Sequence, residues 1–401
     1  MARLKNFISY GKNVYNIEEI NAVNQTLKKS TQMGVNVKNF EKQISKIFGF
    51  KYGIMVNSGS SAILLCLKLL NLKKNDEIIV PNLNFGTAIS SILICGLKPK
   101  FVDVNKSTLQ IDENKIEKNI SKKTKALMIP NLIGNLPNWE KIKKIKKKYN
   151  LILIEDSADT MGATYNKKKS SFYADFSITS FYGSHVISCA GNGGMLMLND
   201  KKKYNQGKVL RSWGRLSSVL SNSEKIRKRL DIKIGGVKYD RKFVFDKIGF
   251  NFEPSEIGAS FGLIQLKKFK NFSSIRNKNF NYHKNFFSKL NNFFITPRVD
   301  KKISTNFLAY PILIKQNKFF DRSDLQIFLE DNNIQTRPIF SGNILRHPAF
   351  NHLASNKTVN KFISSDYIMK NGILVGCHQG LTFKDLNYIH KIILRFIKKI
   401  N

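Results

Sequence analysis

Short apolar runs alternate with amphipathic segments through the first part of the chain. Apolar residues that recur every three or four positions predict helices, and short uninterrupted apolar runs predict buried strands. The expected helices cover residues 17–28, 39–48, 63–70, 88–95 and 200–210, and the expected strands cover 52–56, 77–80, 100–104, 125–130, 151–154 and 195–198. This alternation predicts a mostly parallel sheet with helices on both faces and a ligand site at the carboxyl ends of its strands.

The pattern changes near residue 269. A long polar helix is expected at 271–290, followed by a half-buried strand at 307–314, a helix at 323–332 and another strand near 335–339. A chain of 401 residues is too long for one ordinary core. We therefore predict a large domain at 1–268 and a smaller α+β domain at 269–401.

The net charge does not by itself identify a partner. The 67 Lys and Arg residues outnumber the 28 Asp and Glu residues, giving +39, which would suit nucleic acid. The lysines are spread along the whole sequence, however, and no nucleic-acid motif organises them. A general compositional bias explains them better than a dedicated basic surface. We expect no nucleic-acid partner.

The cysteines and the apolar runs indicate in which cellular compartment the protein is expected. Cys66, Cys95, Cys189 and Cys377 have no paired spacing, which argues against a disulfide framework and against a metal site. No apolar run approaches the eighteen residues of a membrane span, and the first residues lack the apolar core of a signal peptide. The prediction is a soluble cytoplasmic protein with reduced thiols and no membrane partner.

Acids, hydroxyls and an imidazole follow the strand expected at 151–154. Asp156 and Asp159 come directly after it, and Ser180 and His185 precede a glycine-rich turn farther along the chain. Because the carboxyl ends of parallel strands meet at one edge of a sheet, these side chains are expected to converge.

A second group of candidates follows two earlier strands. Ser58, Gly59 and Ser60 precede a helix, where free N–H groups and the helix dipole favour an anion. Serine is also a common helix cap, so this turn alone does not establish a binding site. Phe85 has a flat apolar face that suits an aromatic ligand, and the alternative is an ordinary core phenylalanine.

These motifs resemble the DegT/DnrJ/StrS sugar aminotransferase family of pyridoxal phosphate enzymes. In that family a Glu-Asp pair at a strand end precedes Ser-Phe-x-x-x-Lys and a glycine-rich turn, and here Glu155-Asp156, Ser180-Phe181 and the glycines at 191–194 match. His185 stands where the family has its lysine. The 3-dehydratase branch shares this departure. The resemblance covers nearly the whole chain and implies a type I, aspartate aminotransferase-like fold.

The resemblance also implies roles for the candidate residues. Asp156 would pair with the pyridine nitrogen, or it would merely cap a helix. The implied cofactor contacts are Ser58, Gly59, Ser60 and Ser180 near the phosphate, Phe85 on the ring and Asp159 near the ring hydroxyl, where relatives often have Gln or His.

An imidazole moves protons but cannot make the covalent bond that a lysine amine forms with an aldehyde. The resemblance therefore implies pyridoxal or pyridoxamine phosphate held non-covalently, with His185 as the catalytic base at an unperturbed pKa of about 6.5. A histidine satisfied within a core is the alternative. The implied reaction removes the 3-hydroxyl of a nucleotide-linked 4-keto-6-deoxyhexose in deoxysugar and surface polysaccharide synthesis. Glutamate would regenerate pyridoxamine phosphate, and ammonia would be released.

Two residues lie outside these motifs. Asn251 falls in a segment resembling the family's Gly-Tyr-Asn loop, whose asparagine reaches the cofactor phosphate of the neighbouring subunit, and this implies a homodimer. The alternative is an asparagine that favours a local turn. Arg337 suits bidentate recognition of a substrate or glutamate carboxylate, and is equally compatible with an ordinary surface arginine.

Three other functions compete. A nucleotide-sugar aminotransferase would need a lysine at position 185, and the lysines at 167–169 are expected in an exposed hairpin. Residues 211–215, Arg-Ser-Trp-Gly-Arg, resemble the iron–sulfur 3-dehydrases, but no cysteine lies between Cys189 and Cys377 to supply their cluster. A non-catalytic cofactor-binding regulator would be free to lose Asp156 and Ser180 as well, so their retention favours catalysis.

Overall fold

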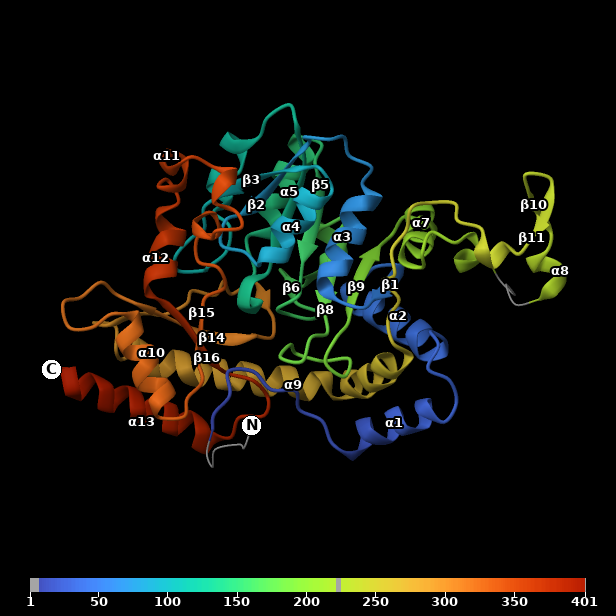
Figure 1. Cartoon of the computed structure of the whole chain (residues 1–401). Helices are drawn as coiled ribbons and strands as arrows, with labels where there is room; N and C mark the ends of the chain where they lie inside the picture. Colours follow the sequence, from blue (N-terminus) through green and yellow to red (C-terminus); the bar gives the residue numbers. More distant parts are fainter. Residues whose placement is uncertain (1–6, 221–224, 401) are drawn as a thin grey trace.

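A seven-stranded sheet forms the centre of the molecule in the computed structural model, which describes residues 7–220 and 225–400 (Figure 1). Its order is β1-β9-β8-β5-β4-β2-β3. The strands are β1 (Tyr52–Val56), β2 (Glu77–Pro81), β3 (Lys98–Val102), β4 (Thr124–Pro130), β5 (Ile152–Asp156), β8 (Phe176–Ser180) and β9 (Gly194–Leu198). Only β9 runs antiparallel to its neighbours, which confirms the mostly parallel sheet.

Helices cover both faces of this sheet because its strands are apolar on both sides. On one face lie α3 (Gly59–Leu69), α4 (Gly86–Ile94) and α7 (Lys201–Arg211). On the other face lie α5 (Trp139–Lys148), α2 (Val35–Phe48) and the first turns of α9 (Glu256–Ser288), with α1 (Ile17–Leu27) packed along α9. The strand ends between these layers are therefore the open edge of the sheet.

A smaller antiparallel sheet, in the order β12-β14-β16-β15, forms the C-terminal part. Its strands are β12 (Phe294–Ile295), β14 (Ala309–Ile314), β15 (Arg337–Pro338) and β16 (Gly372–Gly376), and the helices of this part are α10 (Arg322–Asp331), α11 (Asn356–Val359), α12 (Ile363–Asn371) and α13 (Phe383–Ile400). Its core is closed by α10, α13 and the last turns of α9, and Ile8 joins it by pairing with Ile334. Within residues 7–220 and 225–400, no helix is long and apolar enough to span a membrane.

The helix α9 differs from its prediction. It is one helix from Glu256 to Ser288, so the predicted start at residue 271 is wrong, and the proposed domain boundary at 268 falls inside it. Its first turns approach the loop before β9 closely: a Cβ at Gly262 would lie 2.7 Å from Cys189 Sγ. Glycine lowers helix propensity, so the sequence of this segment does not indicate a helix. Packing against neighbouring parts of the chain keeps the segment helical.

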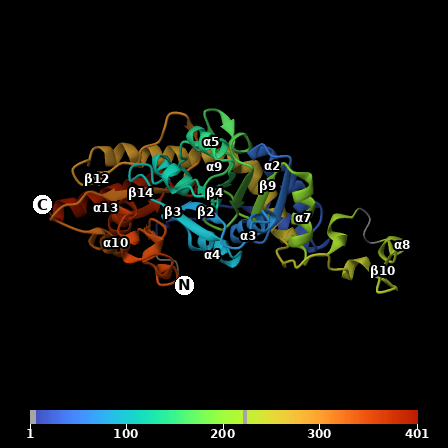
Figure 2. The ribbon, with the colours of Figure 1, turned by 90° about the horizontal axis from the view of Figure 1, so that it is seen from above.

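Two peripheral segments complete the fold. Residues 225–248 form an arm that carries α8 (Ile226–Arg229) and the hairpin of β10 (Ile232–Ile234) and β11 (Val237–Tyr239), and it extends away from both sheets (Figure 2). A three-stranded sheet consists of β6 (Thr164–Tyr165), β7 (Lys168–Lys169) and β13 (Ile303–Ser304). The short helix α6 (Ser170–Tyr173) directly follows β7 in the chain. The lysines at 167–169 are exposed on the β6–β7 hairpin, as predicted.

Candidate active site

A cavity of about 520 Å³ lies at the carboxyl ends of the parallel strands. The turns after β1, β2, β4, β5 and β8 supply most of its wall, and Tyr10, Leu308 and Phe340 complete it from distant parts of the chain. The predicted residues that line it are Ser58, Gly59, Ser60, Phe85, Asp156, Asp159, Ser180 and His185. Each follows or ends a strand at the same edge, which is why the sheet brings them together.

The turn after β1 ends in a helix N-terminus that faces the cavity. Ser58 caps α3, and its Oγ accepts the Ser61 N–H at 3.1 Å. The cap interpretation is therefore right for this side chain, yet the first N–H groups of a helix have no acceptor within the helix and attract an anion. Ser60 Oγ donates to Thr87 Oγ1 at 2.8 Å and so connects this turn to the start of α4.

Gly194 lets β9 lie against this turn. It pairs with Val56 on β1 and with Ser180 on β8, between the two segments that line the cavity. A Cβ at Gly194 would lie 2.3 Å from the carbonyl carbon and oxygen of Ser58 and 2.5 Å from the Gly59 nitrogen. Any larger residue at this position would displace the helix N-terminus.

Two carboxylates lie on the opposite side of the cavity. Asp156 Oδ1 accepts the Ala158 N–H at 3.1 Å, and Asp159 Oδ2 accepts the Ile133 N–H at 2.8 Å. Burial raises the pKa of Asp156 to about 6 and that of Asp159 to about 7. No cationic side chain of the described residues forms an ion pair with either carboxylate. Buried carboxyl groups without a cation suit a ligand that brings a positive charge.

His185 lies in the cavity wall, and one of its ring nitrogens is unpaired among the described residues. Its Nδ1 is buried and makes no hydrogen bond within the described part of the chain. A histidine that merely fills a core would normally have this nitrogen paired, so the core alternative is disfavoured. Burial lowers the pKa of His185 to about 4, although the nearby Ser180 backbone raises it. The imidazole is therefore neutral at pH 7.

Arg276 holds the backbone of the His185 loop in place. The buried guanidinium, which comes from α9, donates from Nη2 to the His185 carbonyl oxygen at 3.2 Å. It also donates to the carbonyl oxygens of Phe307 and Leu308 at 3.0 Å and to Gln379 Oε1 at 2.6 Å. Sequence reasoning missed Arg276 because nothing in its local pattern separates it from a surface residue of a polar helix.

Phe85 is an exposed aromatic in the cavity wall. It precedes α4, and its side chain is 60% exposed, so the core alternative for it is wrong. Tyr10 also lines the cavity, and its N–H donates to Gln335 Oε1 at 3.0 Å. Sequence reasoning missed Tyr10, which lies before the first helix where no motif marks it. Burial raises the pKa of its hydroxyl far above the ordinary value.

Asn251 and Arg337 do not line this cavity. Asn251 is exposed, and its carbonyl oxygen accepts a hydrogen bond from Asn57 Nδ2 at 3.4 Å, next to the α3 turn. Arg337 is exposed beside a second hollow of about 390 Å³, which shares Tyr10, Phe85 and other residues with the first. Their proposed roles stay predictions.

The cavity fits pyridoxal phosphate. The helix N-terminus suits the phosphate, Phe85 offers a flat face for a ring, and Asp156 is a half-buried carboxylate without an ion pair among the described residues. The described residues that line the cavity include no lysine. These lining residues therefore allow the cofactor to be held without a covalent bond to the chain.

Comparisons with known proteins agree with this fit. A model of the DegT/DnrJ/EryC1/StrS aminotransferase family matches residues 14–394. The chain is 32% identical to GDP-4-keto-6-deoxy-D-mannose 3-dehydratase of Escherichia coli O55:H7, over 90% of this chain and 92% of that protein. It is 27% identical to GDP-perosamine synthase of Caulobacter vibrioides, over 90% and 89% of the two chains.

A solved structure shows the same fold. The crystal structure of GDP-4-keto-6-deoxymannose-3-dehydratase with a trapped PLP–glutamate geminal diamine superposes with a TM-score of 0.81 at 30% identity, over 96% of this chain and 99% of that chain. The predicted type I aminotransferase fold, with its large mostly parallel sheet and its C-terminal antiparallel sheet, is confirmed.

Proposed function

This chain belongs to the DegT/DnrJ/EryC1/StrS aminotransferase family, and we propose that it removes the 3-hydroxyl of a nucleotide-linked 4-keto-6-deoxyhexose. It is a pyridoxal-phosphate-dependent enzyme of the aminotransferase superfamily. The observation that carries the finer proposal is the chemistry of the cavity, where a neutral imidazole lies in the wall and no lysine is among the described lining residues. Proton transfer is available at this position, and a covalent bond to the cofactor aldehyde is not.

The chain binds the cofactor by its phosphate and its ring. Ser58, Gly59 and Ser60 at the start of α3, with Ser180, would hold the phosphate, and Phe85 would cover one face of the ring. When bound, pyridoxamine phosphate supplies an amine that condenses with the 4-keto group and a ring that withdraws electrons.

The two carboxylates keep that ring electron-poor. Asp156 would accept the N–H of the pyridine nitrogen, and that positive charge would lower the pKa of Asp156 from its value of about 6. Asp159, which accepts the Ile133 N–H, would face the ring hydroxyl. Its raised pKa of about 7 leaves a proton available for a hydrogen bond to that oxygen.

His185 moves the proton. Its neutral ring would accept the proton that C4′ of a bound cofactor gives up when the 3-hydroxyl of the sugar leaves. The donors of Arg276 fix the His185 backbone, so the imidazole is presented to the cavity in one position. Glutamate would supply the amine for the next turnover, and the nitrogen passed to the sugar would leave as ammonia.

We also propose that the active unit is a homodimer. The exposed Asn251 lies beside the α3 turn and would reach the cofactor phosphate of a second copy. The arm at 225–248 carries exposed apolar side chains, with Val237 at 62%, Phe245 at 61% and Ile248 at 96% exposure. Apolar groups that project in this way are usually covered by a partner. Arg337, at the second hollow, is proposed to meet a carboxylate of the substrate or of glutamate.

A nucleotide-sugar aminotransferase is the second candidate, since the similarity extends to GDP-perosamine synthase. Both candidates predict that glutamate reacts with the protein loaded with pyridoxal phosphate. Titration with glutamate should shift the cofactor absorbance and produce 2-oxoglutarate. A protein that binds the cofactor but shows neither change would be a binding regulator, and the proposal of catalysis would be wrong.

A further inference from the structure

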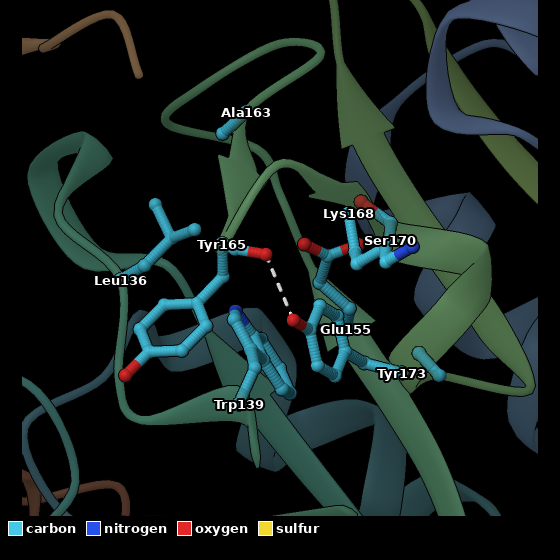
Figure 3. Close-up of a pocket in the computed structure, with 9 residues that line it drawn as sticks. Leu136, Trp139, Glu155, Ala163, Tyr165, Lys168, Ser170 and Tyr173 are labelled. Carbon is cyan, nitrogen blue, oxygen red and sulfur yellow. Dashed lines mark hydrogen bonds between the residues drawn. The ribbon is translucent and has the colours of Figure 1, made fainter. Parts of the chain in front are cut away.

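Glu155 lies directly behind the active-site carboxylates. Successive residues of a strand face opposite sides of the sheet, so Asp156 reaches the cavity while Glu155 points to the far side. Its side chain enters a small hollow beside Trp139, Tyr165 and Tyr173, at the base of α5 (Figure 3). Glu155 is 3% exposed. A buried carboxyl group is costly and is retained only where donors satisfy it.

Hydrogen bonds from three neutral side chains satisfy this carboxyl group, and one of them comes from Ser170. Asn131 Nδ2 donates to Glu155 Oε1 and Ser177 Oγ donates to Glu155 Oε2, both at 2.7 Å. The other side of the Asn131 amide is also engaged, because its Oδ1 accepts the Trp139 Nε1–H at 3.2 Å. The Asn131 side chain is therefore held in one orientation by a donor on one side and an acceptor on the other.

Asn131 connects this hollow to both site carboxylates. Its backbone N–H donates to the Asp156 carbonyl oxygen at 2.8 Å, which fixes the end of β5. Its carbonyl oxygen accepts the Gly134 N–H at 3.0 Å, which closes the turn at 131–134. The Ile133 N–H of that turn donates to Asp159 Oδ2 at 2.8 Å. The position of one amide side chain thus affects the end of β5 and the hydrogen bond on Asp159.

The turn at 131–134 is strained and needs this support. Ile133 has φ 60° and ψ 9°, in the left-handed region that a β-branched residue rarely adopts. Such a conformation persists only where the surrounding contacts determine it. The Leu308 N–H bonds the Ile133 carbonyl oxygen at 2.9 Å from one side, and Asn131 closes the turn from the other.

We infer that Glu155, acting through Asn131, is a positioning residue that sets the placement of Asp156 and Asp159 for the cofactor. This inference rests on the proposed function. Glu155 does not touch the cavity, so its effect on binding must pass through the hydrogen bond to Asn131. Exchanging the carboxyl group at position 155 with the amide at position 131 tests whether the two residues act through this hydrogen bond.

Asn131→Asp places a second carboxyl group against Glu155. Glu155 Oε1 then loses the hydrogen bond that Asn131 Nδ2 donates. In the double variant Asn131→Asp/Glu155→Gln, the new amide donates to the new carboxyl group. The Glu155→Gln oxygen still accepts from Ser177 Oγ, and the aspartate still accepts from Trp139 Nε1. The matched control is Tyr173→Phe, which removes the 2.8 Å bond from Tyr173 Oη to the Tyr165 carbonyl oxygen in the same hollow and leaves Asn131 untouched (Figure 3).

The dissociation constant of pyridoxal phosphate, measured by fluorescence quenching, is the main readout, together with the absorbance of the bound cofactor. Asn131→Asp should weaken binding by about tenfold. The double variant should return to within about threefold of wild type, and Tyr173→Phe should lower the unfolding temperature without changing the dissociation constant. A double variant that binds no better than Asn131→Asp, or an Asn131→Asp protein that binds like wild type, would overturn the inference.

Apoprotein stability provides a second reading that needs no cofactor. Denaturant unfolding of the single and double variants gives the coupling between positions 131 and 155. If Asn131→Asp fails to fold, recovery of folding in the double variant supports the inference, and failure of both overturns it. If the wild-type protein does not bind pyridoxal phosphate, the proposed function is wrong. If the stability changes of the two single variants add up to that of the double variant, Glu155 and Asn131 are not coupled, and only this inference is wrong.

Discussion

Gly194→Ala should displace the anion-binding turn without touching any side chain of the site. The added Cβ would lie 2.3 Å from the Ser58 carbonyl and 2.5 Å from the Gly59 nitrogen, where ordinary contacts lie at 3.4 Å or more. The turn must therefore move by roughly 1 Å, a displacement large enough to reduce function a hundredfold at other sites. Backbone strain does not contribute, because Gly194 is not among the residues with positive φ.

The expected result is a loss of cofactor affinity together with a loss of folding stability. Over-packing of this kind costs about 1–3 kcal/mol of folding free energy. We expect the dissociation constant of pyridoxal phosphate to rise at least tenfold, which corresponds to about 1.4 kcal/mol. Gly86→Ala is the control, since its Cβ would meet only the Phe350 ring at 3.7 Å.

The assay is equilibrium binding followed by cofactor fluorescence, with thermal unfolding of each apoprotein measured in parallel. Gly86→Ala should bind within about twofold of wild type. If Gly194→Ala is folded and binds the cofactor as tightly as Gly86→Ala, the N-terminus of α3 is not the phosphate site, and the assignment of Ser58, Gly59 and Ser60 is refuted.

Four further results are expected. His185→Asn should bind the cofactor like wild type but lose turnover by about a hundredfold or more, and unchanged turnover would exclude His185 as the base. Borohydride reduction with pyridoxal phosphate should leave no phosphopyridoxyl-lysine in a peptide map, and an adduct on a cavity lysine would contradict non-covalent binding. Asp156 is ionised above its pKa of about 6, so cofactor affinity should fall as the pH drops below that value. Asp156→Asn should remove this pH dependence, and identical profiles in the two proteins would exclude Asp156 as the group responsible. Mixed dimers of His185→Asn and Asn251→Ala chains should regain activity if each variant alone is inactive, and no recovery after verified subunit exchange would argue against a shared site.

The strand ends were predictable from the sequence because local pattern and topology agree there. An apolar run followed by a polar group implies a strand end, and parallel strands place such ends at one edge. Asp156, Ser180 and His185 meet in the cavity for this reason. Ser58 was harder to interpret, because helix caps and anion sites use the same residues, and the structure shows that it is a cap whose helix also faces the cavity.

Other parts of the site depend on contacts between distant segments. Tyr10 reaches the cavity because the N-terminal segment pairs beside Ile334, and no local pattern could show this pairing. Arg276 is buried by carbonyl groups from segments 31 to 103 residues away. The full length of α9 was missed because glycines near its start weaken the helical pattern while packing keeps them in the helix.

The central claim is that the enzyme removes the oxygen at C3 of the sugar, and analysis of the product tests this claim most directly. The wild-type protein, loaded with pyridoxamine phosphate, is incubated with a panel of nucleotide-linked 4-keto-6-deoxyhexoses and glutamate, and the sugar mass and free ammonia are measured. The account predicts a 3-deoxy-4-keto product that has lost one oxygen, with one ammonia released and one glutamate consumed per sugar. An amino sugar that keeps its 3-hydroxyl, formed without free ammonia, would contradict it.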